Sequence, residues 1–164
     1  MRNLYIDFDG VIMDTINVTY DMIREIGIPE GDENTISKFY MDLDWKYLLS
    51  VTGDINNGLE MIQKIIDSNK FNVAILTHVY SLEEAVEKVK FIRKYYKDIT
   101  VIPVPKAISK TKMVRTKDSI LIDDYTKNLN EWEKEGGIGV KFSLTLNGKG
   151  YKVIDRLDKV IDMF

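Results

Sequence analysis

The stretch that decides the fold of this chain is LYIDFDGVI, residues 4–12. Its first residues are apolar types that favour β structure, so they predict a buried strand, and two carboxylates and a glycine stand where that strand must end. Asp7 and Asp9 are two positions apart on an extended backbone, which directs both side chains to the same side. At an effective dielectric constant of about 20, two unit charges roughly 4 Å apart repel by about 4 kcal/mol. A bound divalent cation is the simplest way to offset this repulsion.

The composition narrows the classes of site that the chain can form. Its 164 residues fit one domain with a small inserted lobe, and 23 basic against 26 acidic residues give a net charge of −3 with both signs interspersed. This balance gives no argument for binding a nucleic-acid polymer. With no cysteine and one histidine, disulfides, thiolate catalysis and a multi-histidine metal site are excluded, so a metal would sit on oxygen ligands, which favours Mg²⁺.

The location is expected to be cytoplasmic, without a membrane partner. A strand that starts almost at Met1 leaves no room for a signal peptide, and no apolar run approaches the length needed to span a bilayer.

Strand and helix patterns alternate along most of the chain. After the first strand, further strands are predicted at 71–77, 99–104, 119–122 and 138–142. Helices are predicted at 15–26, twice within 33–51, and at 57–68, 81–96, 126–135 and 151–163. Ser81 and Glu84 are interpreted only as the cap of their helix. The fold class is therefore α/β, with a five-stranded parallel sheet covered by helices on both faces and joined by right-handed crossovers.

The helical stretch between the first two strands is too long for a plain crossover. It predicts a division into a catalytic core, residues 1–14 and 70–164, and a small helical cap, residues 15–69. In such sheets ligands bind beyond the carboxyl ends of the strands, so the cap is expected to stand over that edge.

Polar residues follow the ends of four predicted strands. They are Asp7 and Asp9, Thr77, Lys106 and Lys110, and Asp123 and Asp124. Each one alone is also consistent with a helix cap, a turn or a solvated loop. If all of them had only such structural roles, their meeting on one edge of one sheet would be a coincidence. The four clustered carboxylates would still need a cation.

Phosphoryl transfer is the chemistry that uses this set. Asp7 can attack phosphorus and form an acyl phosphate, which splits one hard displacement into two easier ones. Asp9 can protonate the leaving oxygen and later deprotonate the attacking water. Mg²⁺ held by the Asp7 carboxylate, the Asp9 backbone carbonyl and the pair Asp123 and Asp124 would reduce the repulsion between the nucleophile and an anionic phosphate.

The residues expected to bind the substrate phosphate include a lysine that the sequence leaves ambiguous. Gly10 lets the backbone approach the phosphate, and Thr77 and a lysine would bind the oxygens on which negative charge develops. Lys106 and Lys110 lie closest after their strand, and Lys112 also has an acceptable spacing to the later acidic pair. Lys110 is the residue we predict, with the other two kept open.

At these residues the sequence resembles the haloacid dehalogenase (HAD) superfamily of aspartate-nucleophile phosphatases. DFDGV at 7–11, Thr77, a lysine near 110 and LIDD at 121–124 match its four motifs in order. The resemblance implies a Rossmann-like three-layer sandwich, Mg²⁺ and an aspartyl-phosphate intermediate. The short cap and residues 120–142 look most like the 5′-deoxynucleotidase branch, the type C 5′(3′)-deoxyribonucleotidases.

Substrate selection is expected to depend on the cap. Its aromatic residues could stack on a nucleobase or form the core of the cap, and they include Phe39, Tyr40, Trp45 and Tyr47. Trp45 is the best single candidate for a substrate contact. His78, next to Thr77, could contact the phosphoryl group or only satisfy a neighbouring carbonyl.

The sequence thus predicts a Mg²⁺-dependent phosphomonoesterase acting on nucleoside or deoxynucleoside 5′-monophosphates. A phosphatase or phosphomutase of another small metabolite is the enzymatic alternative. A receiver-like phosphoacceptor domain and an inactive relative that only binds phosphate are the non-enzymatic ones.

Overall fold

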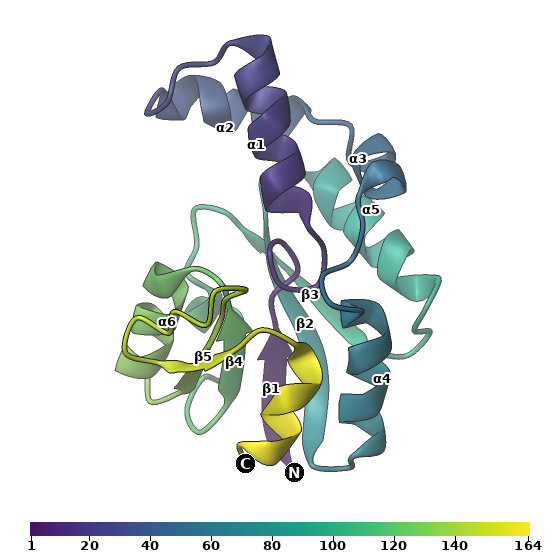
Figure 1. The fold of residues 1–164 in the computed structure, drawn as a ribbon, viewed down its shortest axis with the longest axis vertical. Coiled ribbons are helices and arrows are strands. Elements are labelled where there is room, and N and C mark those ends of the chain that lie inside the picture. Colours follow the sequence, from purple (N-terminus) through teal and green to yellow (C-terminus); the bar gives the residue numbers. More distant parts are fainter.

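The computed structural model describes residues 1–164 and contains one parallel sheet of six strands (Figure 1). The order across the sheet is β3-β2-β1-β4-β5-β6. The strands are β1 (Arg2–Ile6), β2 (Phe71–Val79), β3 (Thr100–Pro105), β4 (Ile120–Asp123), β5 (Ile138–Phe142) and β6 (Lys152–Ile154). The predicted α/β class and parallel sheet are confirmed.

The strand count of five is wrong, because part of the expected closing helix at 151–163 is a strand. Residues 152–154 pair with the edge of β5, and Leu157–Asp162 form only a short 3-10 helix, η2. Val153 and Ile154 are spaced from Leu157 as on one side of a helix, but a short apolar run does not distinguish a helix from a strand. The free backbone groups along the edge of β5 decide between the two, since they accept a further strand.

Helices cover both faces of the sheet. They are α1 (Thr15–Ile26), α2 (Glu33–Asp42), α3 (Trp45–Val51), α4 (Gly58–Asp67), α5 (Leu82–Arg93) and α6 (Thr126–Lys134), with η1 (Lys110–Lys112) and η2 as 3-10 helices. Alternate residues of β1 face opposite layers: Leu4 and Ile6 join a large core with α3, α4, α5 and η2, whereas Tyr5 packs with Trp132 of α6. None of the helices is long and apolar enough to cross a membrane.

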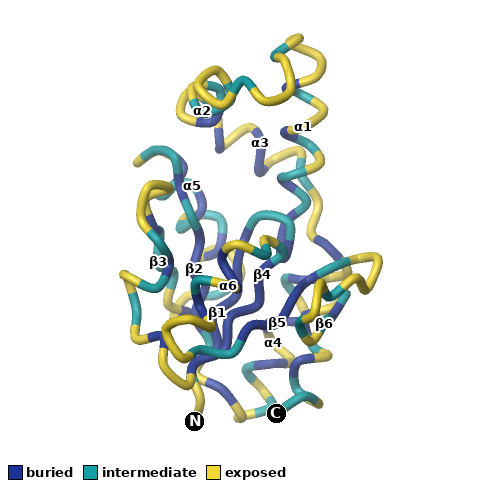
Figure 2. The backbone as a smooth tube through the Cα atoms, turned by 90° about the vertical axis from the view of Figure 1, so that its left-hand side faces the viewer, coloured by how far each residue is buried: buried dark blue, intermediate teal, exposed yellow.

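The insertion between β1 and β2 contains four helices, of which two pack into the core of the sheet layer and two stand apart from it. Leu48 of α3 and Ile62 and Ile65 of α4 are fully buried in the core of the sheet layer. By contrast, α1 and α2 stand beyond the carboxyl end of the sheet, and most of their surface is exposed (Figures 1 and 2).

The register of the central strands brings their carboxyl ends together. Ile6 of β1 lies opposite Ile75 of β2 on one side and Ile122 of β4 on the other. The residues that follow these positions therefore lie side by side at one edge of the sheet.

Candidate active site

Three carboxylates meet at the end of β1 and β4. Asp7, Asp123 and Asp124 each offer an oxygen within 4.8 Å of the others. The backbone N–H of Asp7 donates to the Ile122 carbonyl at 3.0 Å, which continues the sheet pairing one residue beyond β1. Asp123 is also fixed at both oxygens, because it accepts hydrogen bonds from the Tyr125 backbone N–H at 2.9 Å and from the Asn128 amide at 3.0 Å.

The crowding of these carboxylates changes their proton affinity. Burial, followed by repulsion from Asp123, raises the pKa of Asp7 to about 7, although Lys110 acts in the opposite direction. Burial, followed by repulsion from Asp7 and Asp123, raises the pKa of Asp124 to about 9. Without a metal, the cluster therefore retains a proton near neutral pH.

The donor set fits a magnesium ion. Three carboxylate groups are hard oxygen ligands of the kind that Mg²⁺ prefers, and a divalent cation would replace the retained proton. The Asp9 side chain is not part of this group.

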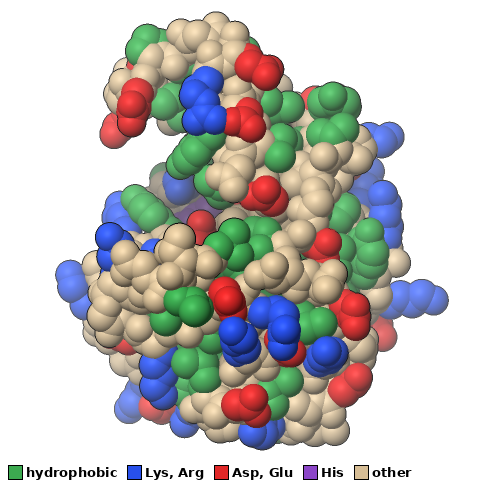
Figure 3. Space-filling view, in the orientation of Figure 1, with side chains coloured by type: hydrophobic (Ala, Val, Ile, Leu, Met, Phe, Trp, Pro, Cys, Tyr) green, Lys and Arg blue, Asp and Glu red, His purple; other side chains and the backbone are tan.

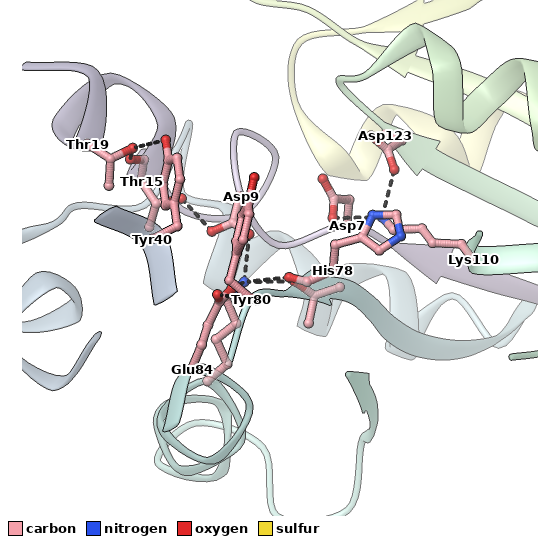
Figure 4. A network of polar contacts seen from close by, with 12 residues as sticks. Asp7, Asp9, Thr15, Thr19, Tyr40, His78, Tyr80, Glu84, Lys110 and Asp123 are labelled. Carbon is pink, nitrogen blue, oxygen red and sulfur yellow. Dashed lines mark hydrogen bonds and ion pairs between the residues drawn. The ribbon is translucent and has the colours of Figure 1, made fainter. Parts of the chain in front are cut away.

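Lys110 is the lysine that contacts the carboxylate cluster. Its ammonium donates to Asp7 Oδ1 at 2.8 Å and to Asp123 Oδ2 at 2.7 Å, and the side chain is almost fully buried (Figure 4). Burial lowers the pKa of Lys110, but the attraction of Asp123 and Asp7 outweighs it and raises the pKa overall. The other candidates lie elsewhere: Lys106 lines the cleft beside the Tyr80 and Tyr125 rings, and Lys112 is exposed near Glu135.

The Asp9 side chain is not part of the carboxylate cluster and is held at both oxygens. It accepts hydrogen bonds from the Thr15 hydroxyl at 2.6 Å and from the Lys88 ammonium at 2.6 Å. Neither partner was predicted. Lys88 had a sequence signal, since Glu84, Lys88 and Ile92 recur every four residues and share one buried side of α5.

Gly10 is required by the geometry of the loop after β1. Its φ of +75° lies in the left-handed region, and an added Cβ would overlap the Asp124 carboxylate and lie 3.0 Å from its Cγ. The chain can therefore turn tightly against the acidic cluster only with glycine at this position.

Thr77 and His78 follow one another on β2 but face different surroundings. Thr77 is fully buried, and its hydroxyl accepts from Lys88 at 3.0 Å and donates to the His78 carbonyl at 3.3 Å. The His78 ring lines the cleft, and its Nε2–H donates to the Ile108 carbonyl at 2.8 Å. Burial, partly countered by that hydrogen bond, lowers the pKa of His78.

A cleft of about 660 Å³ opens over the cluster, between the sheet edge and the lobe formed by α1 and α2 (Figure 3). On the lobe side, the lining combines apolar and aromatic residues with four polar or charged ones. The first group is Ile16, Tyr20, Ile23, Ile28, Ile36 and Tyr40, and the second is Thr15, Thr19, Arg24 and Glu30. Tyr40 stacks on Tyr80 with ring centroids 4.9 Å apart. The cleft is large enough for a small organic molecule attached to a phosphate.

Trp45 also lines the cleft, although only 2% of its surface is exposed. Its ring lies under the Lys88 ammonium, 4.6 Å from the centroid, and its indole N–H has no acceptor. Of the other predicted aromatic candidates, only Tyr40 lines the cleft; Tyr47 is exposed.

No protein-family model matches the chain, and no curated protein matches it at a significant level. Solved structures do. A HAD phosphatase from Thermococcus onnurineus is 16% identical, with 99% of this chain and 97% of that chain covered and a TM-score of 0.62. A HAD-superfamily hydrolase of subfamily IA from Geobacter sulfurreducens PCA is 13% identical, with both chains fully covered and the same TM-score of 0.62.

A HAD-superfamily hydrolase from Ehrlichia chaffeensis is 13% identical, with 99% of this chain and 97% of that chain covered and a TM-score of 0.56. None of these three proteins is described as a deoxynucleotidase, so that branch stays a prediction. At these identities the likeness concerns the fold: this chain has the fold of the HAD-superfamily hydrolases.

Proposed function

We propose that the protein is a phosphomonoesterase that works through an aspartyl-phosphate intermediate on Asp7. The observation that carries this proposal is the contact of one buried cation, Lys110, with Asp7 and Asp123 at the floor of the cleft. A carboxylate beside a fixed ammonium and two further carboxylates suits attack on an anionic phosphorus centre once a metal is bound.

The metal proposed for this site is Mg²⁺, held by the carboxylates of Asp7, Asp123 and Asp124 and by the backbone carbonyl of Asp9. When bound, it would neutralise negative charge on the nucleophile and on the substrate phosphate. The raised pKa values of Asp7 and Asp124 support this assignment, because burial and the repulsion between the carboxylates both disfavour their negative charge, which a bound cation would stabilise.

The side chains would act in two steps. In the first, an Asp7 oxygen forms a bond to phosphorus while the bond to the leaving oxygen breaks, and Asp9 gives that oxygen a proton. In the second, Asp9 takes a proton from water, the water oxygen attacks phosphorus, and the Asp7–phosphate bond breaks. Both residues then return to their starting state, and inorganic phosphate is released.

The phosphate-binding groups proposed are Gly10, Thr77, His78 and Lys110. Thr77 would have to turn its hydroxyl proton from the His78 carbonyl to a phosphate oxygen. Two N–H groups of the Lys110 ammonium donate to carboxylates, which leaves the third for a phosphate oxygen. Gly10 supplies a backbone without a side chain beside the Asp124 carboxylate. His78 lines the cleft, and its Nε2–H would have to leave the Ile108 carbonyl in order to donate to a phosphate oxygen.

The substrate proposed is a nucleoside or deoxynucleoside 5′-monophosphate. The tyrosine rings of the cleft offer flat apolar surfaces suited to a base. Trp45, almost fully buried beneath Lys88, would influence specificity only through the edge that lines the cleft. Within the predicted cap, residues 15–69, α1 and α2 would be the part that closes over the substrate, since α3 and α4 pack into the core of the sheet layer.

A screen for phosphate release tests this proposal. Purified protein with Mg²⁺ should release phosphate from small phosphomonoesters, and it should lose activity in EDTA and in an Asp7→Asn variant. Full activity of Asp7→Asn would overturn the nucleophile assignment. Activity confined to sugar phosphates would overturn the nucleotide assignment alone, and an isomerised product without released phosphate would indicate a phosphomutase.

A further inference from the structure

Lys88 is a buried cation that the proposed mechanism does not use. It belongs to α5, and none of its surface is exposed. Its ammonium donates to Asp9 Oδ2 at 2.6 Å, to Glu84 Oε2 at 2.5 Å, to the Thr77 hydroxyl at 3.0 Å and to the His78 carbonyl at 3.1 Å.

These contacts leave Lys88 no capacity to bind a substrate itself. An ammonium has three N–H groups, and here they are shared among four acceptors inside the protein. Any effect of Lys88 on the reaction must therefore act through the residues it holds.

Of the side chains that Lys88 contacts, that of Asp9 is the one exposed in the cleft, since the Glu84 side chain is only 2% exposed. Each of its oxygens accepts one hydrogen bond from the interior, one from Lys88 and one from Thr15. The two oxygens of a carboxyl group have about four sites in total that can accept a hydrogen bond or carry a proton, so further sites stay free. Because 20% of the side chain is exposed and Asp9 lines the cleft, those sites are available to a ligand there.

Packing alone gives no reason for a charged pair at this place. Lys88 lies over the Phe8 and Trp45 rings, and Glu84 is also buried, so both charges have been removed from water. A buried ion pair is often no more stabilising than apolar side chains of similar volume. A leucine or methionine would fill the position, but it could not hold Asp9.

We infer that Lys88, itself anchored by Glu84, is a positioning residue that holds the Asp9 carboxyl at the place where it exchanges a proton with the leaving oxygen. This inference rests on the proposed function. It predicts that loss of Lys88 matters most for substrates whose leaving oxygen needs a proton as the bond to phosphorus breaks.

The test compares kcat/KM for two aryl phosphates, since this parameter includes the first phosphoryl transfer. Phenyl phosphate has a poor leaving group that depends on a general acid, whereas p-nitrophenyl phosphate leaves as a stable anion. In Lys88→Met, kcat/KM should fall about 100-fold for phenyl phosphate and stay within about 3-fold for p-nitrophenyl phosphate. Equal losses for both substrates, or no loss for either, would overturn the inference.

Two further variants complete the experiment. Lys90→Met removes an exposed lysine from the same helix and should leave both rates unchanged. The double variant Glu84→Gln with Lys88→Met removes both buried charges, and it provides the same comparison if the single variant does not fold.

The Asp9→Asn variant distinguishes failure of the inferred role of Lys88 from failure of the proposed role of Asp9. If Asp9→Asn is selective between the substrates and Lys88→Met is not, the inference fails alone. If Asp9→Asn is not selective, the proposed role of Asp9 fails, and the inference fails with it.

Discussion

Raising the pH of the metal-free protein should destabilise it, and Mg²⁺ should abolish this effect. Burial and mutual repulsion raise the pKa of Asp7 from 3.8 to about 7 and that of Asp124 from 3.8 to about 9. The folded protein therefore holds protons that the unfolded chain has lost. A raised carboxyl pKa contributes stability below pH 3.8, and that contribution is lost as the pH rises toward the folded value.

The size of the effect follows from the number of extra protons. Between pH 7 and pH 9 the folded cluster holds about one proton more than the unfolded chain, which corresponds to about 1.4 kcal/mol per pH unit and to roughly 2–3 kcal/mol over this range. For a chain of this length, 1 kcal/mol shifts the melting temperature by roughly 2–4 °C, so a fall of roughly 5–10 °C is expected.

Thermal unfolding followed by circular dichroism measures this fall, in EDTA and in saturating Mg²⁺. In Mg²⁺ the curve should be nearly flat over the same range, since the ion replaces the retained proton. The matched control is Asp124→Asn, which removes one of the three crowded carboxylates and should flatten the curve without metal. A melting temperature in EDTA that is constant or rises from pH 7 to pH 9 would refute the reasoning.

Two substitutions test other contacts of the site. Gly10→Ala places a side chain at a φ of +75° and against the Asp124 carboxylate, so it should cost at least about 1–2 kcal/mol in a urea titration and weaken Mg²⁺ binding measured by calorimetry. Unchanged stability and Mg²⁺ affinity would contradict that geometry. Lys110→Met leaves Asp7 and Asp123 buried without their cation and should destabilise the metal-free protein by about 3–5 kcal/mol, whereas exposed Lys112→Met should change stability by less than about 0.5 kcal/mol. Similar losses of stability in the two lysine variants would show that the buried contacts of Lys110 with Asp7 and Asp123 do not stabilise the protein more than an exposed lysine does.

The part of the fold that could be predicted from the sequence is the part fixed by local pattern. Asp7 and Asp123 could be placed at one edge because each follows an apolar run, and parallel strands end on the same side of a sheet. β6 could not be predicted, because three residues carry too little periodicity and gain their structure from pairing with β5. That pairing depends on the tertiary arrangement.

The same distinction holds for the site. The sequence offered three lysines after β3, and only the turn through η1 brings Lys110 into contact with Asp7. Lys88 was missed because the prediction interpreted Glu84 only as part of the helix cap and gave Lys88 no role. Both side chains are buried, whereas the apolar residues Ala85 and Val89 of the same helix are only partly buried. The four-residue spacing of Glu84 and Lys88 was a signal of their pairing, but the contact with Asp9 depends on the tertiary arrangement.

The central claim is that Asp7 becomes covalently phosphorylated, and chemical trapping of that bond tests it most directly. The protein is mixed with Mg²⁺ and a substrate that it hydrolyses, quenched in acid during turnover and treated with borohydride, which reduces an acyl phosphate to an alcohol. Mass spectrometry then locates the reduced residue. The account predicts reduction at position 7 and at no other carboxylate, with none in Asp7→Asn. Reduction at Asp9, Asp123 or Asp124, or continued turnover by Asp7→Asn, would contradict it.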